Sequence, residues 1–402
     1  MSNRFYFNFF YIFFCALLPI SFIYVGNAYP ELNYFMLGLF SDSVIVPGLI
    51  YASLTCIILI VCVNYFSQPS GGIKTYERFE ITYLKYRNII FFLALIGTLG
   101  NIALNFIYGQ AATNIEASRP LVATFIGYIF NALAIFFYVQ LLSQFYLYGK
   151  FTAYGLILII LFLIEGSLAG SRSGMFLVIS LILFISIFSP RKLKINFFYL
   201  SILILLGIFF ILFGELIRGT DLTYFLVNAL SRFFQFNVVL FFALEDFDTV
   251  NRILLENQPQ TIISQLFSFV YGERLPPSSV RLPEFWGSDI IIQENGHMVG
   301  YVYGWMGLSY GLFSWGGLLF TLIFFLISFF FTKKCIENPS IFSFIFLSII
   351  ALTFFEYFGN LGLDSFLEKI FKRSIWGLIT YIIVLFTLPF IKPIGSRNQS
   401  AL

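Results

Sequence analysis

A single arginine lies among small residues between two long apolar runs of this chain. Residues 168–176 read LAGSRSGMF, so Arg172 has a serine and then a glycine on either side. Glycine lets the backbone turn sharply and approach a ligand closely, and a guanidinium binds phosphate or carboxylate through two parallel hydrogen bonds. Because ionisable residues at membrane depth are functional-site candidates by default, we predict that Arg172 contacts a bound anion. The alternative is an arginine that reaches a lipid phosphate or pairs with Glu165.

A second arginine follows a later apolar run, in the stretch GELIRGTD at residues 214–221. Glu215 and Arg218 are three residues apart, so they share one face of a helix and can pair there. A local ion pair is therefore one interpretation. The other is that Arg218 provides a second contact to the anion that Arg172 is expected to bind.

Residues 271–311 combine acidic, basic and aromatic side chains with the only histidine of the chain. His297, with Glu294 nearby and Glu273 upstream, is a candidate for catalysis or for contact with a substrate, and the alternative is a structural histidine. The candidates for anion contacts are Arg274 and Arg281, and those for stacking on a sugar are Trp286, Tyr301, Tyr303 and Trp305. This mixture suits a glycan, which binds through aromatic stacking and through hydrogen bonds to carboxylates and amides. The aromatic residues suit equally a belt at the membrane surface.

The composition identifies the class of protein that must position these residues. Of 402 residues, 59% are hydrophobic and only 11% are charged, with a net charge of +3. Apolar runs of about 18 or more residues recur along the whole length, which is typical of transmembrane helices. No basic run suits nucleic acid, and no Gly-rich loop followed by lysine and a hydroxyl residue suits ATP. The four cysteines fall in predicted spans or at a cytoplasmic end, so we expect no disulfide framework, no thiolate metal site and no cofactor.

We predict about ten transmembrane spans, with the N-terminus in the cytoplasm and an uncleaved first helix. Their approximate ranges are 5–26, 44–66, 89–109, 120–147, 151–169, 174–189, 195–214, 306–331, 341–358 and 375–391. The expected fold is an all-α polytopic integral membrane protein in three parts: membrane helices in 1–214, a large external loop in 215–305 and membrane helices in 306–402. Within the loop, we expect residues 224–247 and 264–280 to form helices that lie in the membrane–water interface or re-enter the bilayer.

Four glycines lead into the eighth predicted span. Gly300, Gly304, Gly307 and Gly311 follow a spacing of four, three and four residues, which places them on one helical face. Such a face lets another helix or a lipid chain approach closely, and helix packing is the expected cause.

Lysine and arginine are distributed unequally between the two predicted sides. The cytoplasmic side carries eight lysines and five arginines, and the external side carries eight arginines and two lysines. Both residue types orient a membrane protein, but only arginine presents a planar fork that binds phosphate in a bidentate way. The external excess of arginine therefore favours an anionic ligand on that side, with chance in a small sample as the alternative.

The chain resembles the O-antigen polymerase (Wzy) family of membrane glycan polymerases. The resemblance covers the whole length as an architecture of ten to twelve spans, often rich in phenylalanine (56 residues here), with one large external loop late in the chain. It is sharpest at GSRSG, residues 170–174, which is similar to a short Gly-Ser-Arg element between adjacent spans of many members. Arg218 and the late run GERLP…ENGH…GYVYG are similar in placement.

The resemblance implies a GT-C-like enzyme in the bacterial inner (cytoplasmic) membrane, with its active site facing the periplasm. It implies a glycosyltransferase of polysaccharide and lipopolysaccharide biosynthesis, which transfers the growing glycan from undecaprenyl diphosphate onto a new lipid-linked repeat unit. Arg172, Arg218 and Arg274 or Arg281 would contact the diphosphate, and Glu294, His297 or Glu273 would accept the proton of the acceptor hydroxyl. The implied partners are undecaprenyl-diphosphate-linked oligosaccharides, membrane lipids and a regulator of chain length.

Two alternatives remain at this point. An O-antigen ligase would move the finished glycan onto a lipid A core and would also use a long external loop with a histidine. A flippase for the lipid-linked sugar would place charged residues along a path through the membrane and show paired halves. The charges of this sequence gather at one predicted face and no halves repeat, so an enzyme is favoured over a transporter.

Overall fold

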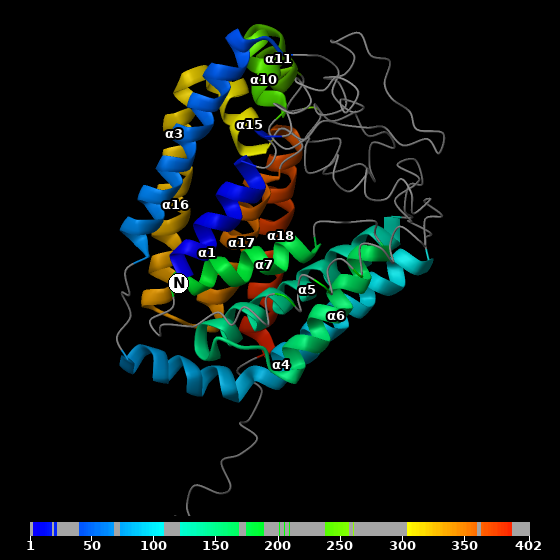
Figure 1. The fold of residues 1–402 in the computed structure, drawn as a ribbon. Helices are drawn as coiled ribbons and strands as arrows, with labels where there is room; N and C mark the ends of the chain where they lie inside the picture. Colours follow the sequence, from blue (N-terminus) through cyan, green and yellow to red (C-terminus); the bar gives the residue numbers. More distant parts are fainter. Residues whose placement is uncertain are drawn as a thin grey trace, which may run out of the picture.

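All the secondary structure in the described part of the chain is helical. The computed structural model describes residues 3–17, 20–21, 40–67, 73–107, 121–168, 174–188, 238–256, 304–359 and 363–387, with the single residues 201, 205, 209 and 260. Figure 1 shows long helices gathered into a bundle, with shorter helices packed across one end. The predicted all-α architecture is confirmed for these residues.

Six helical segments among the described residues are long and apolar enough to cross a membrane. They are α3 (Asp42–Phe66), α4 (Ile73–Ile107), α5 (Leu121–Tyr148), the stretch from α15 (Gly304–Phe313) through η3 (Ser314–Gly316) to α16 (Gly317–Glu337), α17 (Ile341–Phe358) and α18 (Leu363–Thr387). Two shorter apolar helices, α6 (Ala153–Leu168) and α7 (Gly174–Ser186), accompany them. A helix satisfies its own backbone hydrogen bonds, as the interior of a bilayer requires. The chain is therefore a multi-pass membrane protein.

The predicted spans agree with the structure where the apolar runs are uninterrupted. The spans predicted at 44–66, 120–147 and 341–358 coincide with α3, α5 and α17 to within two residues at each end. The first predicted span falls on α1 (Asn3–Phe9) and the π-helix η1 (Phe10–Leu17), and its later part lies outside the described residues. The span predicted at 195–214 also lies outside them, apart from residues 201, 205 and 209. The count of ten spans therefore stays a prediction.

Two segments that the sequence predicts as loops are helical. α4 begins at Ile73, well before its predicted span, and α18 begins at Leu363. Hydropathy marks where apolar residues stop, whereas a helix continues while its backbone bonds and tertiary contacts hold. Tyr76 shows such a contact in the polar part of α4, since its hydroxyl donates to the Leu147 carbonyl oxygen at the end of α5. With 35 residues, α4 is about 52 Å long at 1.5 Å per residue, more than the roughly 30 Å of a hydrocarbon core.

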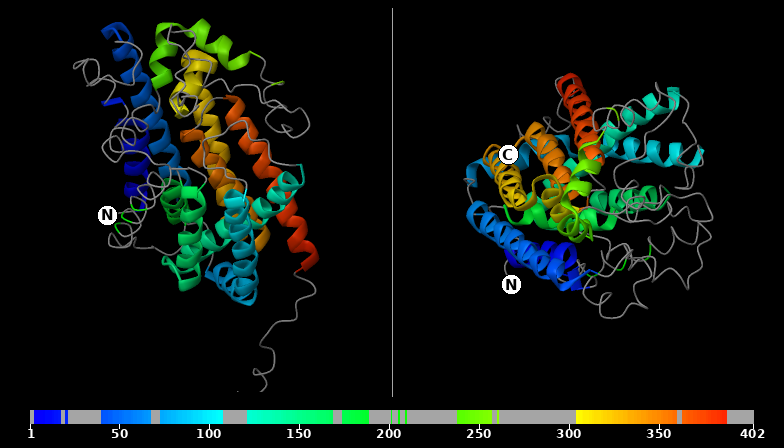
Figure 2. Two further views of the ribbon diagram at one scale, coloured as in Figure 1. Left: turned by 90° about the vertical axis from the view of Figure 1, so that its right-hand side faces the viewer. Right: turned by 90° about the horizontal axis from the view of Figure 1, so that it is seen from above.

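Helix α18 lies between two groups of long helices. α3 and α16 pack side by side, and α4 packs along α5 and α6 (Figure 1). α18 contacts both α17 and α5, and in the view from above it stands between the group of α16 and α17 and that of α4 and α5 (Figure 2). The hydroxyl of Thr380 donates to the Ala132 carbonyl oxygen at 2.6 Å, which fastens α18 to α5.

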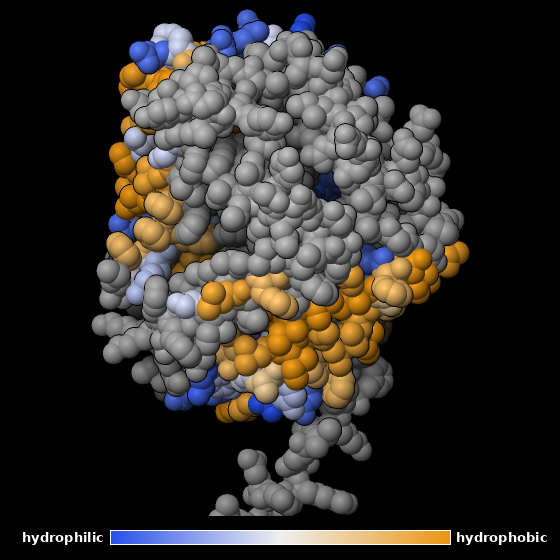
Figure 3. Space-filling view, turned by 45° about the vertical axis from the view of Figure 1, so that its right-hand side comes forward, coloured by the Kyte–Doolittle hydropathy of each residue, from blue (hydrophilic) through white to orange (hydrophobic). Residues whose placement is uncertain are grey.

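The outer surfaces of these helices are apolar. Figure 3 shows a continuous hydrophobic band over the lower part of the molecule. Large exposed apolar side chains on α4, α5 and α6 include Phe92, Ile96, Phe125, Ile129 and Ile160. Monomeric soluble proteins rarely expose so much contiguous apolar surface, so this surface is suited to contact with lipid.

Two short helices lie within the predicted external loop, α10 (Val238–Glu245) and α11 (Phe247–Leu255). Both pack against α15, where a Cβ added to Gly307 would lie 3.0 Å from Val239 and one added to Gly311 would lie 2.8 Å from Leu254. The predicted glycine groove is thus confirmed as a helix contact at these two positions. Asn251 of α11 also donates through Nδ2 to the carbonyl oxygens of Gly311 at 2.9 Å and of Leu312 at 3.0 Å.

The start of α11 gives a testable pH dependence. Asp246 is its N-cap, and the carboxylate accepts a hydrogen bond from the Thr249 backbone N–H at 3.1 Å. Hydrogen bonds from Thr249 hold the pKa of Asp246 below its usual range. Because the folded-state pKa is the lower one, the cap stabilises the helix above the unfolded value near 4 and loses this effect as the pH falls through the folded value.

Asp246→Ala is therefore expected to destabilise α11 by about 1 kcal/mol at neutral pH, and by less in acid. Faster amide hydrogen exchange at Thr249 measures the loss. An exchange rate that does not change at pH 7 would contradict the capping role.

Candidate functional site

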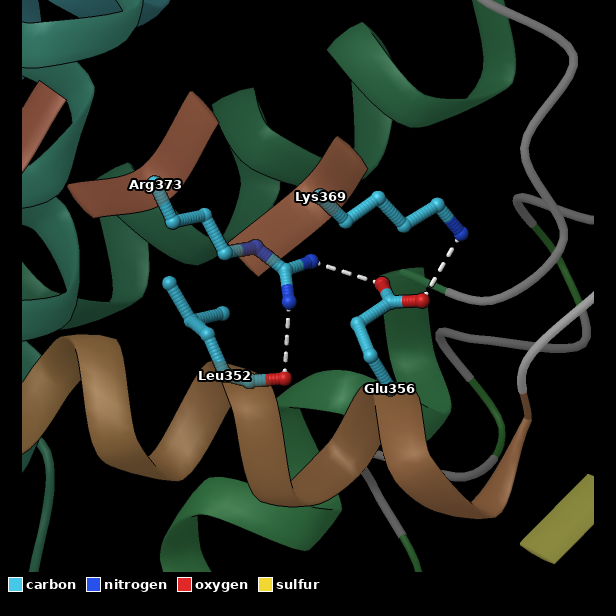
Figure 4. Close-up of polar contacts among 4 residues, drawn as sticks. All are labelled: Leu352, Glu356, Lys369 and Arg373. Atoms are coloured by element: carbon cyan, nitrogen blue, oxygen red, sulfur yellow. Dashed lines mark hydrogen bonds and ion pairs between the residues drawn. The ribbon is translucent and has the colours of Figure 1, made fainter. Parts of the chain in front are cut away.

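Three charged side chains join α17 and α18 near the turn between these helices. Glu356 lies in the last turn of α17, and Lys369 and Arg373 lie one helical turn apart on α18. The carboxylate of Glu356 accepts hydrogen bonds from Lys369 Nζ at 2.7 Å and from Arg373 Nη2 at 2.6 Å (Figure 4). Arg373 Nη1 also donates to the Leu352 carbonyl oxygen at 2.8 Å. We refer to Glu356, Lys369 and Arg373 as the ion cluster.

The ion cluster is mostly withdrawn from solvent but not equally so. The side chains of Glu356 and Arg373 are 13% and 11% exposed, whereas Lys369 is 36% exposed. Two cations share one carboxylate, which leaves one unit of positive charge. Holding the two helices together is one role of this arrangement. A second role is to contact an anion through Lys369 and Arg373, because charged groups within membrane helices are costly and commonly functional.

A polar cavity of about 90 Å³ lies beside the ion cluster. Arg373 lines it, so the cavity and the cluster are continuous. Helices α4, α5, α6, α17 and α18 all contribute to its wall, which includes the aromatic rings of Phe137 and Phe162. Its other polar lining residues are Thr98, Asn101, Asn131, Tyr138, Glu165 and Trp376.

Close packing of α4 on α5 brings the two asparagines together. A Cβ added to Gly97 would lie 2.4 Å from the backbone nitrogen of Ala134, so the two helices approach where α4 has no side chain. Four residues further along α4, Asn101 Nδ2 donates to Asn131 Oδ1 at 3.1 Å. Asn101 also lies against the carboxyl of Glu165 at the end of α6. The lack of a side chain at Gly97 thus sets the spacing of the polar wall.

Ten of the predicted site residues lie outside the described residues. They are the candidate proton acceptors Glu273, Glu294 and His297, the arginines Arg172, Arg218, Arg274 and Arg281, and the aromatic residues Trp286, Tyr301 and Tyr303. Their roles and their distances from the cavity stay predictions. Glu165, which does line the cavity, precedes Arg172 by seven positions in the sequence.

Trp305 is the one predicted sugar-stacking residue that the structure describes. It is fully buried, with its ring centroid 4.6 Å from that of Phe358 and 5.6 Å from that of Phe325. A ring enclosed in this way has no face open to a ligand. The structure therefore gives Trp305 a packing role between α15, α16 and α17.

The sequence interpretation did not assign a role to most residues of this site. Lys369 and Arg373 fall between the spans predicted at 341–358 and 375–391, and Glu165 was considered only as an ion-pair partner. The available signals were the four-residue spacing of Lys369 and Arg373, the lone Glu356 in an apolar run, and the asparagines at 101 and 131 within predicted spans. Each is common in isolation, and only the fold shows that they converge.

Comparisons with protein-family models, with curated proteins and with solved structures found no match. The ion cluster and the cavity are therefore the basis for assigning a function. Together they offer basic groups for an anion and an adjoining polar space of limited volume.

Proposed function

We propose that this chain is a polysaccharide repeat-unit polymerase that acts on lipid-diphosphate-linked glycans. It transfers the growing glycan from undecaprenyl diphosphate onto a new lipid-linked repeat unit. The observation that carries the proposal is the ion cluster, which holds two basic groups on one carboxylate beside a polar cavity. A diphosphate leaving group and the sugar that it carries need two such adjoining environments.

The positions of these groups along their helices agree with a site on the external face. Under the predicted topology, the last turns of α6 and α17 and the first turns of α18 face outward. Glu165 and Glu356 lie in those last turns, and Lys369 and Arg373 lie within the first three turns of α18. In this proposal the bundle is a GT-C-like fold of about ten spans in the bacterial inner membrane, and its site faces the periplasm.

The chemistry that the ion cluster would supply is electrostatic. Negative charge develops on the diphosphate as the glycosidic bond breaks, and preorganised donors in a poorly hydrated site stabilise such charge by about 3 kcal/mol each. Lys369 is the more accessible cation and Arg373 is the more fixed one. They join Arg172, Arg218 and Arg274 or Arg281 as proposed contacts to the diphosphate. Glu294, His297 and Glu273 remain the proposed acceptors for the hydroxyl proton, and a chain-length regulator remains a proposed partner.

A flippase for the same lipid-linked glycan is the second candidate. One observation favours it: Glu165, Glu356 and Arg373 lie in apolar helices of the bundle, and charged residues within a membrane also mark transport paths. A ligase remains the nearest enzymatic alternative. Loss of a polymerase leaves single repeats on the acceptor lipid, loss of a ligase leaves no attached glycan, and loss of a flippase leaves the substrate on the cytoplasmic leaflet.

Reconstitution tests the proposal directly. The purified chain in nanodiscs is given lipid-diphosphate-linked repeat units extracted from cells that lack it, with no added nucleotide or metal. A ladder of products spaced by one repeat is expected, and Arg172→Ala is expected to lower its rate by about 100-fold, the effect of removing one such donor.

Two results would change the assignment. A normal rate from Arg172→Ala at equal protein level would remove Arg172 from the diphosphate site. No ladder from folded wild-type protein that binds the substrate would contradict a polymerase and favour a ligase or flippase.

A further inference from the structure

The cavity contains a buried hydroxyl that no described residue satisfies. Thr98 is 1% exposed and lines the cavity, and its Oγ1 has no hydrogen-bond partner among the described residues. Threonine in a helix commonly bonds to the carbonyl four residues earlier. Thr55 and Thr332 do so here, at 2.6 and 2.7 Å. Thr98 differs from them, and its hydroxyl remains available to whatever occupies the cavity.

Two further groups in the same wall have capacity for hydrogen bonds. The indole Nε1 of Trp376 is buried without a partner among the described residues. Asn101 bonds to Asn131 and also faces the Glu165 carboxyl, but each of the two amides has two donor hydrogens and an oxygen acceptor, so capacity remains. A buried polar group without a partner costs about 1–3 kcal/mol. The cavity therefore has several donors and acceptors that a polar occupant would satisfy.

The groups in the wall restrict the chemistry of this occupant. Arg373 disfavours a free cation, which would meet a like charge in the same cavity. A lipid tail would leave the Thr98 hydroxyl and the Trp376 N–H without partners. A group rich in hydroxyls avoids both penalties, since a hydroxyl is uncharged and can accept a hydrogen bond from an indole N–H.

We infer that the cavity is a sugar-binding subsite, in which Glu165 accepts a hydrogen bond from a sugar hydroxyl and the Thr98 hydroxyl and Trp376 N–H bind further hydroxyls. The identity of the sugar as part of a lipid-linked glycan rests on the proposed function. Arg373 belongs to both the cavity and the ion cluster, so the sugar in this subsite is the one next to the diphosphate. The volume of about 90 Å³ exceeds the room for one water severalfold, but it admits only the edge of one sugar ring.

Equilibrium binding to the purified chain in nanodiscs tests the subsite with two probes. One is undecaprenyl diphosphate without sugar, and the other is the glycan-bearing lipid extracted from cells that lack this chain. Glu165→Gln and Thr98→Val are each expected to weaken binding of the glycan-bearing lipid by about tenfold. Both should leave the affinity for the sugar-free lipid unchanged. The matched control is Thr332→Val, a buried threonine of α16 whose hydroxyl bonds to the Ser328 carbonyl; it should change neither affinity.

The outcomes separate this inference from the proposed function. If both variants bind the glycan-bearing lipid normally while the wild type forms a ladder, the subsite is wrong and the polymerase stands. If both lipids are weakened equally, or the wild type does not bind the glycan-bearing lipid, the subsite is also wrong. If the variants lose affinity only for the glycan-bearing lipid and the wild type forms no ladder, the subsite is supported and polymerisation is rejected.

Discussion

Arg373→Met is expected to lower the free energy of unfolding by about 3–5 kcal/mol and to abolish the ladder of glycan products. Removal of Arg373 takes one charge-assisted hydrogen bond from Glu356 and leaves Lys369 as the remaining partner of this carboxylate. Arg373 also donates to the Leu352 carbonyl oxygen, so two hydrogen bonds of a charged group are lost, at about 1.5–3 kcal/mol each. Thermal unfolding of the purified chain in detergent measures the first effect, and reconstitution measures the second.

An exposed ion pair provides the control for this prediction. Lys334 pairs with Glu337 within α16, and their side chains are 56% and 24% exposed. This pair does not connect two helices, and pairs of this kind contribute about 0.2–0.5 kcal/mol. Lys334→Met should therefore have a small effect on unfolding. Equal losses from Arg373→Met and Lys334→Met would contradict the bridging role of the ion cluster.

The helices of this protein follow from its sequence wherever composition alone decides the outcome. A run such as that of α17 has only one charged residue, Glu356, and its ends coincide with the ends of the apolar pattern. α4 and α18 were harder to predict because polar turns continue the helix beyond the apolar part. Their true starts depend on contacts between distant segments, such as that of Tyr76 with the end of α5, and hydropathy does not report such contacts.

The candidate site was less predictable for a related reason. Thr98, Asn131 and Glu165 are polar residues in three different, largely apolar runs, and each resembles an ordinary packing position. Whether they form a site depends on which helical faces pack against one another. The positive charges at 369 and 373 fall between two predicted spans, and their shared partner Glu356 is on another helix. Spacing along the chain cannot reveal such a pairing.

Gly97→Ala is expected to destabilise the protein by about 3 kcal/mol, although the intrinsic helix propensity of alanine would predict a gain of about 1 kcal/mol. The added Cβ would lie 2.4 Å from the backbone nitrogen of Ala134 and 2.6 Å from the carbonyl carbon of Leu133. Backbone atoms within a helix cannot move individually, so α4 as a whole must shift away from α5. Thermal unfolding measures the loss.

The matched control is Gly316→Ala, where an added Cβ would meet only Phe313 Cβ at 3.7 Å, an ordinary contact. Its φ of −61° suits alanine, so this variant should be neutral or slightly stabilised. A shift of α4 would also separate Asn101 from Asn131, which are bonded at 3.1 Å. Gly97→Ala should therefore weaken binding of the glycan-bearing lipid while Gly316→Ala does not. An unchanged unfolding temperature for Gly97→Ala would show that α4 and α5 do not meet at this glycine, and that the polar wall of the cavity is not assembled by their contact.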